Sequence, residues 1–217
     1  MTTYKIAVFD MDGTILNTID DIRDAVNEIL RRHAYAERTL PQILHAVGNG
    51  AAHLMEESLP DGRDTADFEA ILREYEAYYE AHCEIRTAPY PGIPELLGRL
   101  KEAGIRLAVV SNKGDGAVKA LNERYFAGAF ESAVGQRPGV RRKPAPDAVF
   151  EALQAFGSDG SDAIYIGDSE VDIATARAAG IPVIAVTWGF RTRELIESLE
   201  PDYLADTPQQ VEKILLS

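Results

Sequence analysis

The amino-acid sequence predicts an α/β fold, with a doubly wound parallel sheet as its core and an all-helical cap domain inserted into it. Short apolar runs alternate with helical patterns through most of the chain, as in a sheet covered by helices on both faces. Gly104 and Gly180 stand just past two helical patterns, where a left-handed helix cap is favoured. One long stretch, 17–86, has helical periodicity only. The alternation elsewhere is that of a Rossmann-like core.

The core strands are predicted by nearly continuous apolar runs without polar alternation, as expected for strands buried on both faces. These runs are residues 5–9, 106–110, 163–166 and 183–186. Two weaker candidate strands lie at 132–134 and 203–204. Helices between the strands are expected at 93–103, 147–156 and 171–179.

The inserted stretch carries two apolar stripes at helical spacing. They consist of Ile19, Ile22, Val26, Ile29 and Leu30, and of Phe68, Ile71, Leu72, Tyr75 and Tyr79. Thr18 with Asp21 resembles a capping box, which predicts the start of a helix. We expect residues 17–86 to form the cap, and residues 1–16 and 87–217 to form the α/β core.

Composition narrows the classes of function. The 217 residues are 46% hydrophobic and 26% charged, which suits one domain or a core with a smaller insertion. The formal net charge of −13 would repel nucleic acid and anionic lipid, so neither is an expected partner. One cysteine, no long apolar span and no signal-peptide pattern lead us to expect a cytoplasmic protein. Monomer and homodimer both stay open.

Acidic residues follow two of the predicted strands, at the edge of an open sheet where ligands bind. Asp10 and Asp12 follow the first run, and Asp168 and Asp172 follow the run 163–166. A turn is the alternative interpretation of the Asp-Gly pair at Asp12. Four carboxylates facing one crevice repel one another unless cations lie among them, and an all-oxygen set favours Mg²⁺.

Hydrogen-bond donors follow the second strand and precede the helix expected at 147–156. Ser111, Asn112 and Lys113 offer a hydroxyl, an amide and an ammonium, which suit phosphoryl oxygens, although a helix N-cap is the alternative. Lys143, which Pro144 holds in a stiff loop, is the cation expected in the site. Its neighbours Arg141 and Arg142 are expected to be solvated.

The chain resembles the haloacid dehalogenase-like hydrolase superfamily in four motifs, which occur in order at the predicted strand ends. They are Asp10-x-Asp12-Gly-Thr14, Ser111, Lys143-Pro and Gly167-Asp168-x-x-x-Asp172. The resemblance covers nearly the whole chain, including the cap inserted after the first motif. Two shorter stretches, 47–51 and 186–190, resemble the phosphoglycolate phosphatase branch.

The resemblance implies a role for each acidic residue. Asp10 would be the nucleophile that becomes an aspartyl phosphate, and Asp12 would act as general acid and then as base. Asp10, Asp168 and the backbone carbonyl of Asp12 would hold Mg²⁺. Asp172 would orient a metal-bound water or Lys143 without binding the metal itself.

The phosphate group of the substrate would be bound by Ser111, Asn112 and Lys143. Further candidates for the site are Thr14, Lys113, Ser169 and Asn49. The cap contains no lysine, which argues against a phosphonate-cleaving enzyme with a Schiff base there. Asp12 argues against a dehalogenase, which does not need a second aspartate.

We therefore expect a Mg²⁺-dependent phosphatase that hydrolyses a small phosphorylated metabolite, with 2-phosphoglycolate as the first choice. A sugar phosphomutase or a pyrophosphatase on the same core stays open. So does a catalytically inactive binding protein, although such a protein would have no reason to retain this costly cluster of charges.

Overall fold

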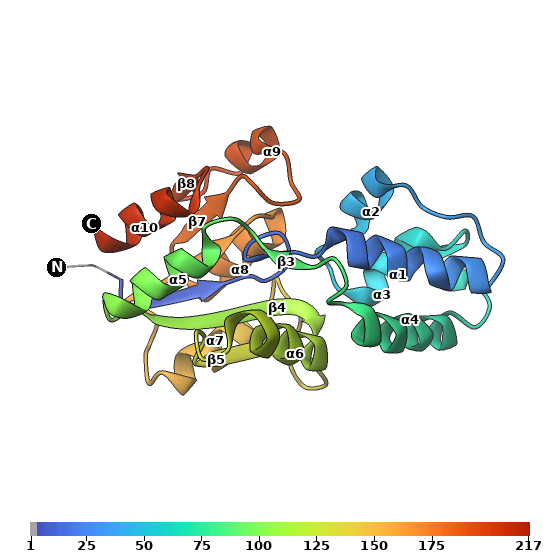
Figure 1. Ribbon diagram of the computed structural model, residues 1–217, viewed down its shortest axis with the longest axis horizontal. Coiled ribbons are helices and arrows are strands. Elements are labelled where there is room, and N and C mark those ends of the chain that lie inside the picture. The colour runs from blue at the N-terminus through green and yellow to red at the C-terminus, as the bar shows by residue number, and fades with distance from the viewer. Residues whose placement is uncertain (1–3) are drawn as a thin grey trace.

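The computed structural model describes residues 4–217 and has the predicted fold: a six-stranded parallel sheet between helices, with further helices beside it (Figure 1). The strand order is β5-β4-β1-β6-β7-β8. The strands are β1 (Ile6–Phe9), β4 (Arg106–Gly114), β5 (Ser132–Gln136), β6 (Ala163–Gly167), β7 (Val183–Val186) and β8 (Tyr203–Ala205). Both weaker candidate strands are therefore confirmed. Residues 1–3 of the expected core segment 1–16 lie outside the described residues.

The sheet is buried on both faces, which explains the unbroken apolar runs. Successive residues of β1 point to opposite sides: Ala7 and Phe9 belong to one apolar cluster, Ile6 and Val8 to the other. The first cluster includes residues of α5 (Ile93–Glu102), α6 (Asp115–Phe126) and α10 (Pro208–Leu216). The second includes residues of α7 (Asp147–Ala155), α8 (Glu170–Ala179) and α9 (Arg193–Ser198).

The inserted helices lie beyond the carboxyl ends of the strands (Figure 1). They are α1 (Ile19–Arg32), α2 (Leu40–Ala46), α3 (Ala51–Ser58), the short 3₁₀ helix η1 (Gly62–Asp64) and α4 (Phe68–His82). The chain enters through β2 (Leu16–Asn17) and returns through β3 (Ala88–Pro89), which pair antiparallel. The sequence showed no sign of this small two-stranded link.

The predicted capping box at Thr18 is wrong. The Thr18 hydroxyl donates to Asp12 Oδ1 at 2.6 Å and caps no helix N–H. The buried Asp21 carboxylate accepts from the backbone N–H groups of Arg86 and Thr87. Both side chains therefore join the start of α1 to other segments of the chain, a tertiary role that displaces the local one.

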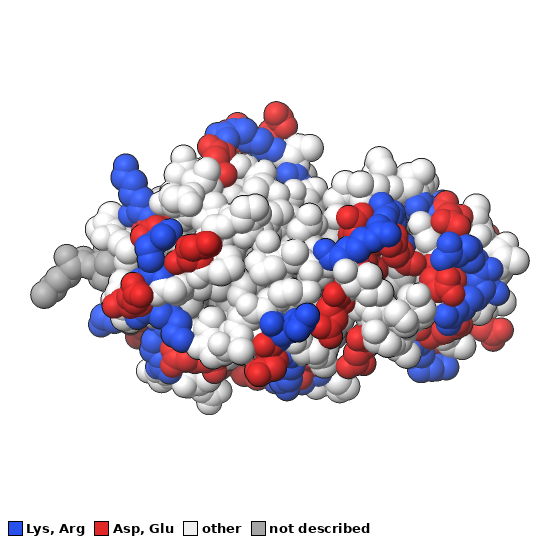
Figure 2. Space-filling model, viewed as in Figure 1, with Lys and Arg blue, Asp and Glu red and all other residues white. Residues whose placement is uncertain are grey.

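Charges of both signs are mixed on the face of the molecule that Figure 2 shows. On the face in Figure 2, Lys and Arg lie interspersed with Asp and Glu, and no continuous basic surface is visible there. Within residues 4–217 we find no helix with the length and apolar character needed to span a bilayer.

Candidate active site

The carboxyl ends of three neighbouring strands bring the motif residues together. Phe9 of β1 lies between Val109 of β4 and Ile166 of β6, so Asp10 emerges between the ends of these two strands. Strand β4 runs on to Gly114 with a register irregularity after Val110, so it contains the second motif itself. Every residue of the four motifs that carries a polar side chain is buried or nearly so.

Lys143 is the centre of the charge cluster. Its Nζ lies 2.8 Å from Asp10 Oδ1, 2.7 Å from Asp172 Oδ1 and 3.1 Å from the Tyr165 hydroxyl. Burial alone would lower the pKa of Lys143, but Asp10 and Asp172 outweigh it and raise the pKa well above its ordinary value. Lys143 therefore stays charged. Tyr165, a strand residue of β6, was missed because its sequence context marks only an apolar run.

Asp172 lies behind Lys143 and does not line the cavity, in contrast to the expectation that it faces the crevice. It occupies the third position of α8, where it forms a capping box with Ser169. The Ser169 hydroxyl donates to Asp172 Oδ2 at 2.6 Å, and the Ser169 N–H donates to the same atom at 3.1 Å. Gly167 makes room, since a Cβ there would overlap the Asp172 side chain. The carboxylate is thus fixed toward Lys143.

Three buried carboxylates form the one group suited to a cation among the described residues. Oxygens of Asp10, Asp168 and Asp172 all lie within 4.8 Å of one another. Burial, followed by the charge of Asp172, raises the pKa of Asp10 well above its ordinary value and that of Asp168 to about 7. Negative charge is therefore costly here until a cation offsets it.

The surroundings of Asp168 fit a metal ligand. Thr14 Oγ1 donates to Asp168 Oδ1 at 3.0 Å and the Phe190 N–H donates to Oδ2 at 2.7 Å, so the carboxylate is held from two sides. Gly13 and Gly189 flank it, and a Cβ at either position would overlap the carboxylate. An all-oxygen set of this kind suits Mg²⁺ better than zinc.

The Asp12 side chain lies apart from this group and has partners of its own. Its Oδ1 accepts from Thr18 Oγ1 and lies 3.1 Å from Lys113 Nζ. Lys113 also donates to the Tyr79 hydroxyl of α4 at 2.5 Å and lies 4.2 Å from the centre of that ring. Lys113, expected beside the phosphate, is therefore paired with Asp12 and with an inserted helix. Tyr79 was assigned only to an apolar stripe.

Asn112 has both polar atoms of its side chain engaged. Its Oδ1 accepts from the Lys143 N–H at 2.7 Å, while its Nδ2 donates to the carbonyls of Gly48 and Lys143. The amide therefore positions Lys143 and does not have the free donor expected for a phosphate contact. Ser111 Oγ accepts from the Lys113 N–H, and Ser111 lines the cavity.

A second set of contacts joins the core to the C-terminal end of α2. Arg191 donates to the carbonyls of Leu44 and Val47 at 2.8 Å each, and it pairs with Glu170 at the start of α8. Arg142, expected to be solvated, is exposed but also donates to the Asn49 carbonyl. The Asn49 side chain makes no contact with the motif residues among the hydrogen bonds of residues 4–217. The sequence analysis missed the role of Arg191, because its only signal is its position next to the stretch 186–190.

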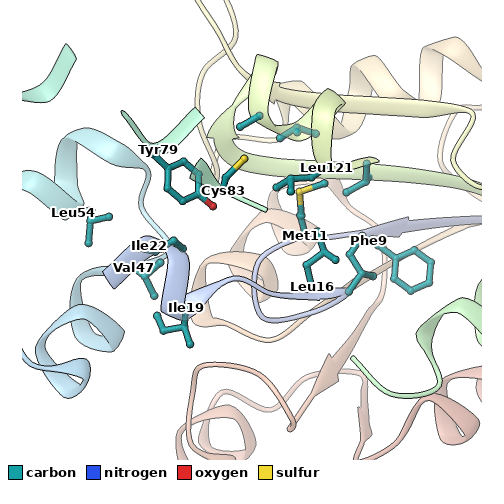
Figure 3. Packing of buried hydrophobic residues seen from close by; sticks show 14 of the residues in the cluster. Phe9, Met11, Leu16, Ile19, Ile22, Val47, Leu54, Tyr79, Cys83 and Leu121 are labelled. Carbon is teal, nitrogen blue, oxygen red and sulfur yellow. The ribbon is translucent and has the colours of Figure 1, made fainter. Parts of the chain in front are cut away.

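The motif residues line a cavity of about 320 Å³ between the sheet and the inserted helices. The inserted helices and their loops supply the apolar side chains of Ile22, Val47, Leu54, Tyr75 and Tyr79, and α4 adds the carboxylates of Glu76 and Glu80. Figure 3 shows the apolar cluster continuing from Phe9 and Met11 in the core to Ile22 and Tyr79. One face of the cavity is thus polar and charged, and the opposite face is largely apolar.

Comparison with known proteins gives a family model and relatives that agree with one another. A family model described as haloacid dehalogenase-like hydrolase matches residues 7–186. A phosphoglycolate phosphatase of Rhodospirillum rubrum is 34% identical over 204 residues, which cover 90% of this chain and 84% of that protein. One of Agrobacterium fabrum is 33% identical, with coverage of 97% and 94%. A crystal structure from Lactobacillus delbrueckii subsp. bulgaricus is 35% identical, has a TM-score of 0.92, and both chains are covered completely.

Proposed function

The chain belongs to the haloacid dehalogenase-like hydrolases, as its motifs indicated, and on this premise we propose that it is a Mg²⁺-dependent phosphatase of small phosphomonoesters. The observation that carries the proposal is the buried group of Asp10, Asp168 and Asp172, paired with Lys143, which lines the cavity together with Asp10 and Asp168. The first substrate to test is 2-phosphoglycolate, which the names of the relatives suggest.

In the first step, a carboxylate oxygen of Asp10 forms a bond to phosphorus, and the bond from phosphorus to the ester oxygen breaks. Asp12 gives its proton to the departing oxygen, which leaves as an alcohol. Lys143 holds Asp10 in place and neutralises charge on the phosphoryl oxygens, and Ser111 donates a hydrogen bond to them. Asp172 and Ser169 keep Lys143 in position.

In the second step, water attacks phosphorus of the aspartyl phosphate, and the bond to Asp10 breaks to release inorganic phosphate. Asp12 takes the proton from that water, so it returns to its starting form. Mg²⁺, held by Asp10, Asp168 and the Asp12 carbonyl, would supply positive charge that stabilises the oxygens of the transferring group. Thr14 acts through Asp168, which it holds in place.

We further propose that residues 17–86 work as a cap domain on a core of residues 1–16 and 87–217. The paired strands β2 and β3 mark the two crossings between them. Closure over the cavity would exclude bulk water during transfer of the phosphoryl group.

The test uses leaving groups that differ in acidity. Asp12→Ala should lose hydrolysis of an alkyl phosphate by about 10²- to 10⁴-fold, because the alkoxide needs a proton. An aryl phosphate leaves without that help, so Asp12→Ala should release a burst of phenol and accumulate phosphate on Asp10. Asp10→Asn should give neither burst nor turnover.

Mass spectrometry of the quenched Asp12→Ala protein locates the phosphate. Phosphate on Ser111, or steady turnover by Asp10→Asn, would contradict the assignment of Asp10 as nucleophile.

A further inference from the structure

The cations that line the cavity differ in how far their donors are already used. Among the described residues these cations are Lys143, Arg191 and Lys113. The Lys143 ammonium donates to Asp172, to the Tyr165 hydroxyl and to the Val110 carbonyl, and it also forms an ion pair with Asp10. Arg191 is held by Glu170 and by two backbone carbonyls at the C-terminal end of α2.

Lys113 retains a donor. Within residues 4–217 its ammonium donates to the Tyr79 hydroxyl at 2.5 Å and forms an ion pair with Asp12 Oδ1 at 3.1 Å. An ammonium carries three N–H groups, so one remains for a ligand. The Lys113 side chain is only 5% exposed and lines the cavity. A nearly buried cation with an unused donor thus borders the substrate space.

The position of Lys113 indicates which part of the substrate it meets. Asp12 is the proposed proton donor to the ester oxygen, so the leaving group must lie next to Asp12. Lys113 lies beside Asp12 and under the ring of Tyr79, on the side of the inserted helices. In the proposed mechanism the phosphoryl group is contacted by Lys143 and Ser111, which also line the cavity. Lys113 therefore faces the leaving alcohol.

We infer that Lys113 determines specificity by binding a negatively charged group of the leaving alcohol, so that the preferred substrates are phosphate esters of small α-hydroxy acids. This inference rests on the proposed phosphatase activity. In an α-hydroxy acid, a single carbon separates the ester oxygen from the carboxylate. Groups as close together as Asp12 and Lys113 can contact both at once.

The rest of the cavity wall favours a short leaving group. Glu76 and Glu80 of α4 also line the cavity, and Glu80 lies against Gly116 at the start of α6. Their carboxylates would repel a second anionic group carried farther from the ester oxygen than Lys113 can reach. A long or doubly phosphorylated leaving group is therefore disfavoured, while a carboxylate close to the ester oxygen is matched by Lys113.

Two esters of similar size test the inference: 2-phosphoglycolate, and 2-hydroxyethyl phosphate, in which a CH₂OH group replaces the carboxylate. In Lys113→Met, kcat/KM should fall at least about tenfold more for phosphoglycolate than for hydroxyethyl phosphate, mainly through KM. Lys113→Arg should recover part of that difference, because it restores the charge. Lys119→Met is the matched control, since this exposed lysine pairs with Asp115 on the surface, and it should leave the ratio unchanged.

An equal loss for both esters in Lys113→Met would overturn the inference, because Lys113 would then act only by positioning Asp12. A measurement on the unaltered chain guards against a variant that fails to fold: glycolate should inhibit competitively at a lower concentration than ethylene glycol. Equal inhibition by glycolate and ethylene glycol, or equal hydrolysis of the two esters, overturns the inference about Lys113 but does not contradict the proposed phosphatase activity. If the protein hydrolyses no phosphate ester in the presence of Mg²⁺, aryl phosphates included, both the inference about Lys113 and the proposed phosphatase activity are overturned.

Discussion

Replacement of Lys143 by Met should destabilise the protein strongly as well as inactivate it. The Lys143 side chain is 3% exposed, and its ammonium lies between the carboxylates of Asp10 and Asp172, of which the second is completely buried. Removal of one partner from a buried ion pair costs about 3–5 kcal/mol, because the remaining charge is left uncompensated. In a chain of this size, each kcal/mol lowers Tm by about 2–4 °C. The expected loss is therefore about 6–20 °C.

The second variant of this experiment combines Lys143→Met with Asp172→Asn. The neutral amide removes one of the two stranded charges and can still accept from Ser169, so about half or more of the lost Tm should return. Activity should not return, because no ammonium is restored beside Asp10 and the phosphoryl group. Thermal unfolding in metal-free buffer followed by circular dichroism gives Tm, and phosphate release gives the rate.

The control for both variants is Lys119→Met, which removes the ion pair of an exposed lysine with Asp115 and should leave Tm nearly unchanged. A Lys143→Met protein as stable as its parent would refute the reasoning. So would a double variant less stable than Lys143→Met, since the cost would then not come from unpaired charge.

Two further predictions concern the metal and the contact between Arg191 and the end of α2. Asp168 has a folded-state pKa of about 7 against an ordinary value of 3.8, so its stabilising contribution is complete below about pH 4 and is lost as pH rises through about 7. The Tm of the metal-free protein should therefore fall between about pH 5 and about pH 8, and Mg²⁺ should raise Tm more at the higher pH. An increase of Tm on Mg²⁺ binding that is the same at every pH would contradict this reasoning. Arg191→Met removes the donors to Leu44 and Val47, so amide hydrogen exchange after α2 should quicken and KM should rise, while the exposed control Arg193→Met should change neither. Unaltered exchange in Arg191→Met would show that these bonds do not hold the loop.

The sheet was predictable because each of its strands leaves a signal in its own residues. Strands buried on both faces need unbroken apolar runs, and helices between them need apolar stripes, so alternation of the two patterns specifies the layers. The strands β2 and β3 have two residues each, too few for any periodicity. The capping box failed for another reason: Thr18 and Asp21 have suitable local spacing but hydrogen-bond to residues elsewhere in the chain.

The residues that form the acidic site were predictable because the strand topology brings them together. Residues at the carboxyl ends of adjacent parallel strands must meet, whatever their separation in sequence. Individual pairings do not follow from that rule. The contact between Tyr165 and Lys143 depends on side-chain packing within the sheet, and that of Arg191 with the end of α2 depends on where the inserted helices lie. Neither leaves a periodic signal.

The two lysines expected beside the phosphate, Lys143 and Lys113, have different partners in the structure. Lys143 neutralises Asp10 and comes from a loop outside the inserted helices, so the direct ion pair of the nucleophile involves neither α1 nor α4. Lys113 lies against Asp12 and donates to Tyr79 of α4. Thr18, the residue before α1, donates to the same Asp12 carboxylate. A displacement of α1 and α4 must therefore change the contacts of the proton donor while those of the nucleophile stay as they are.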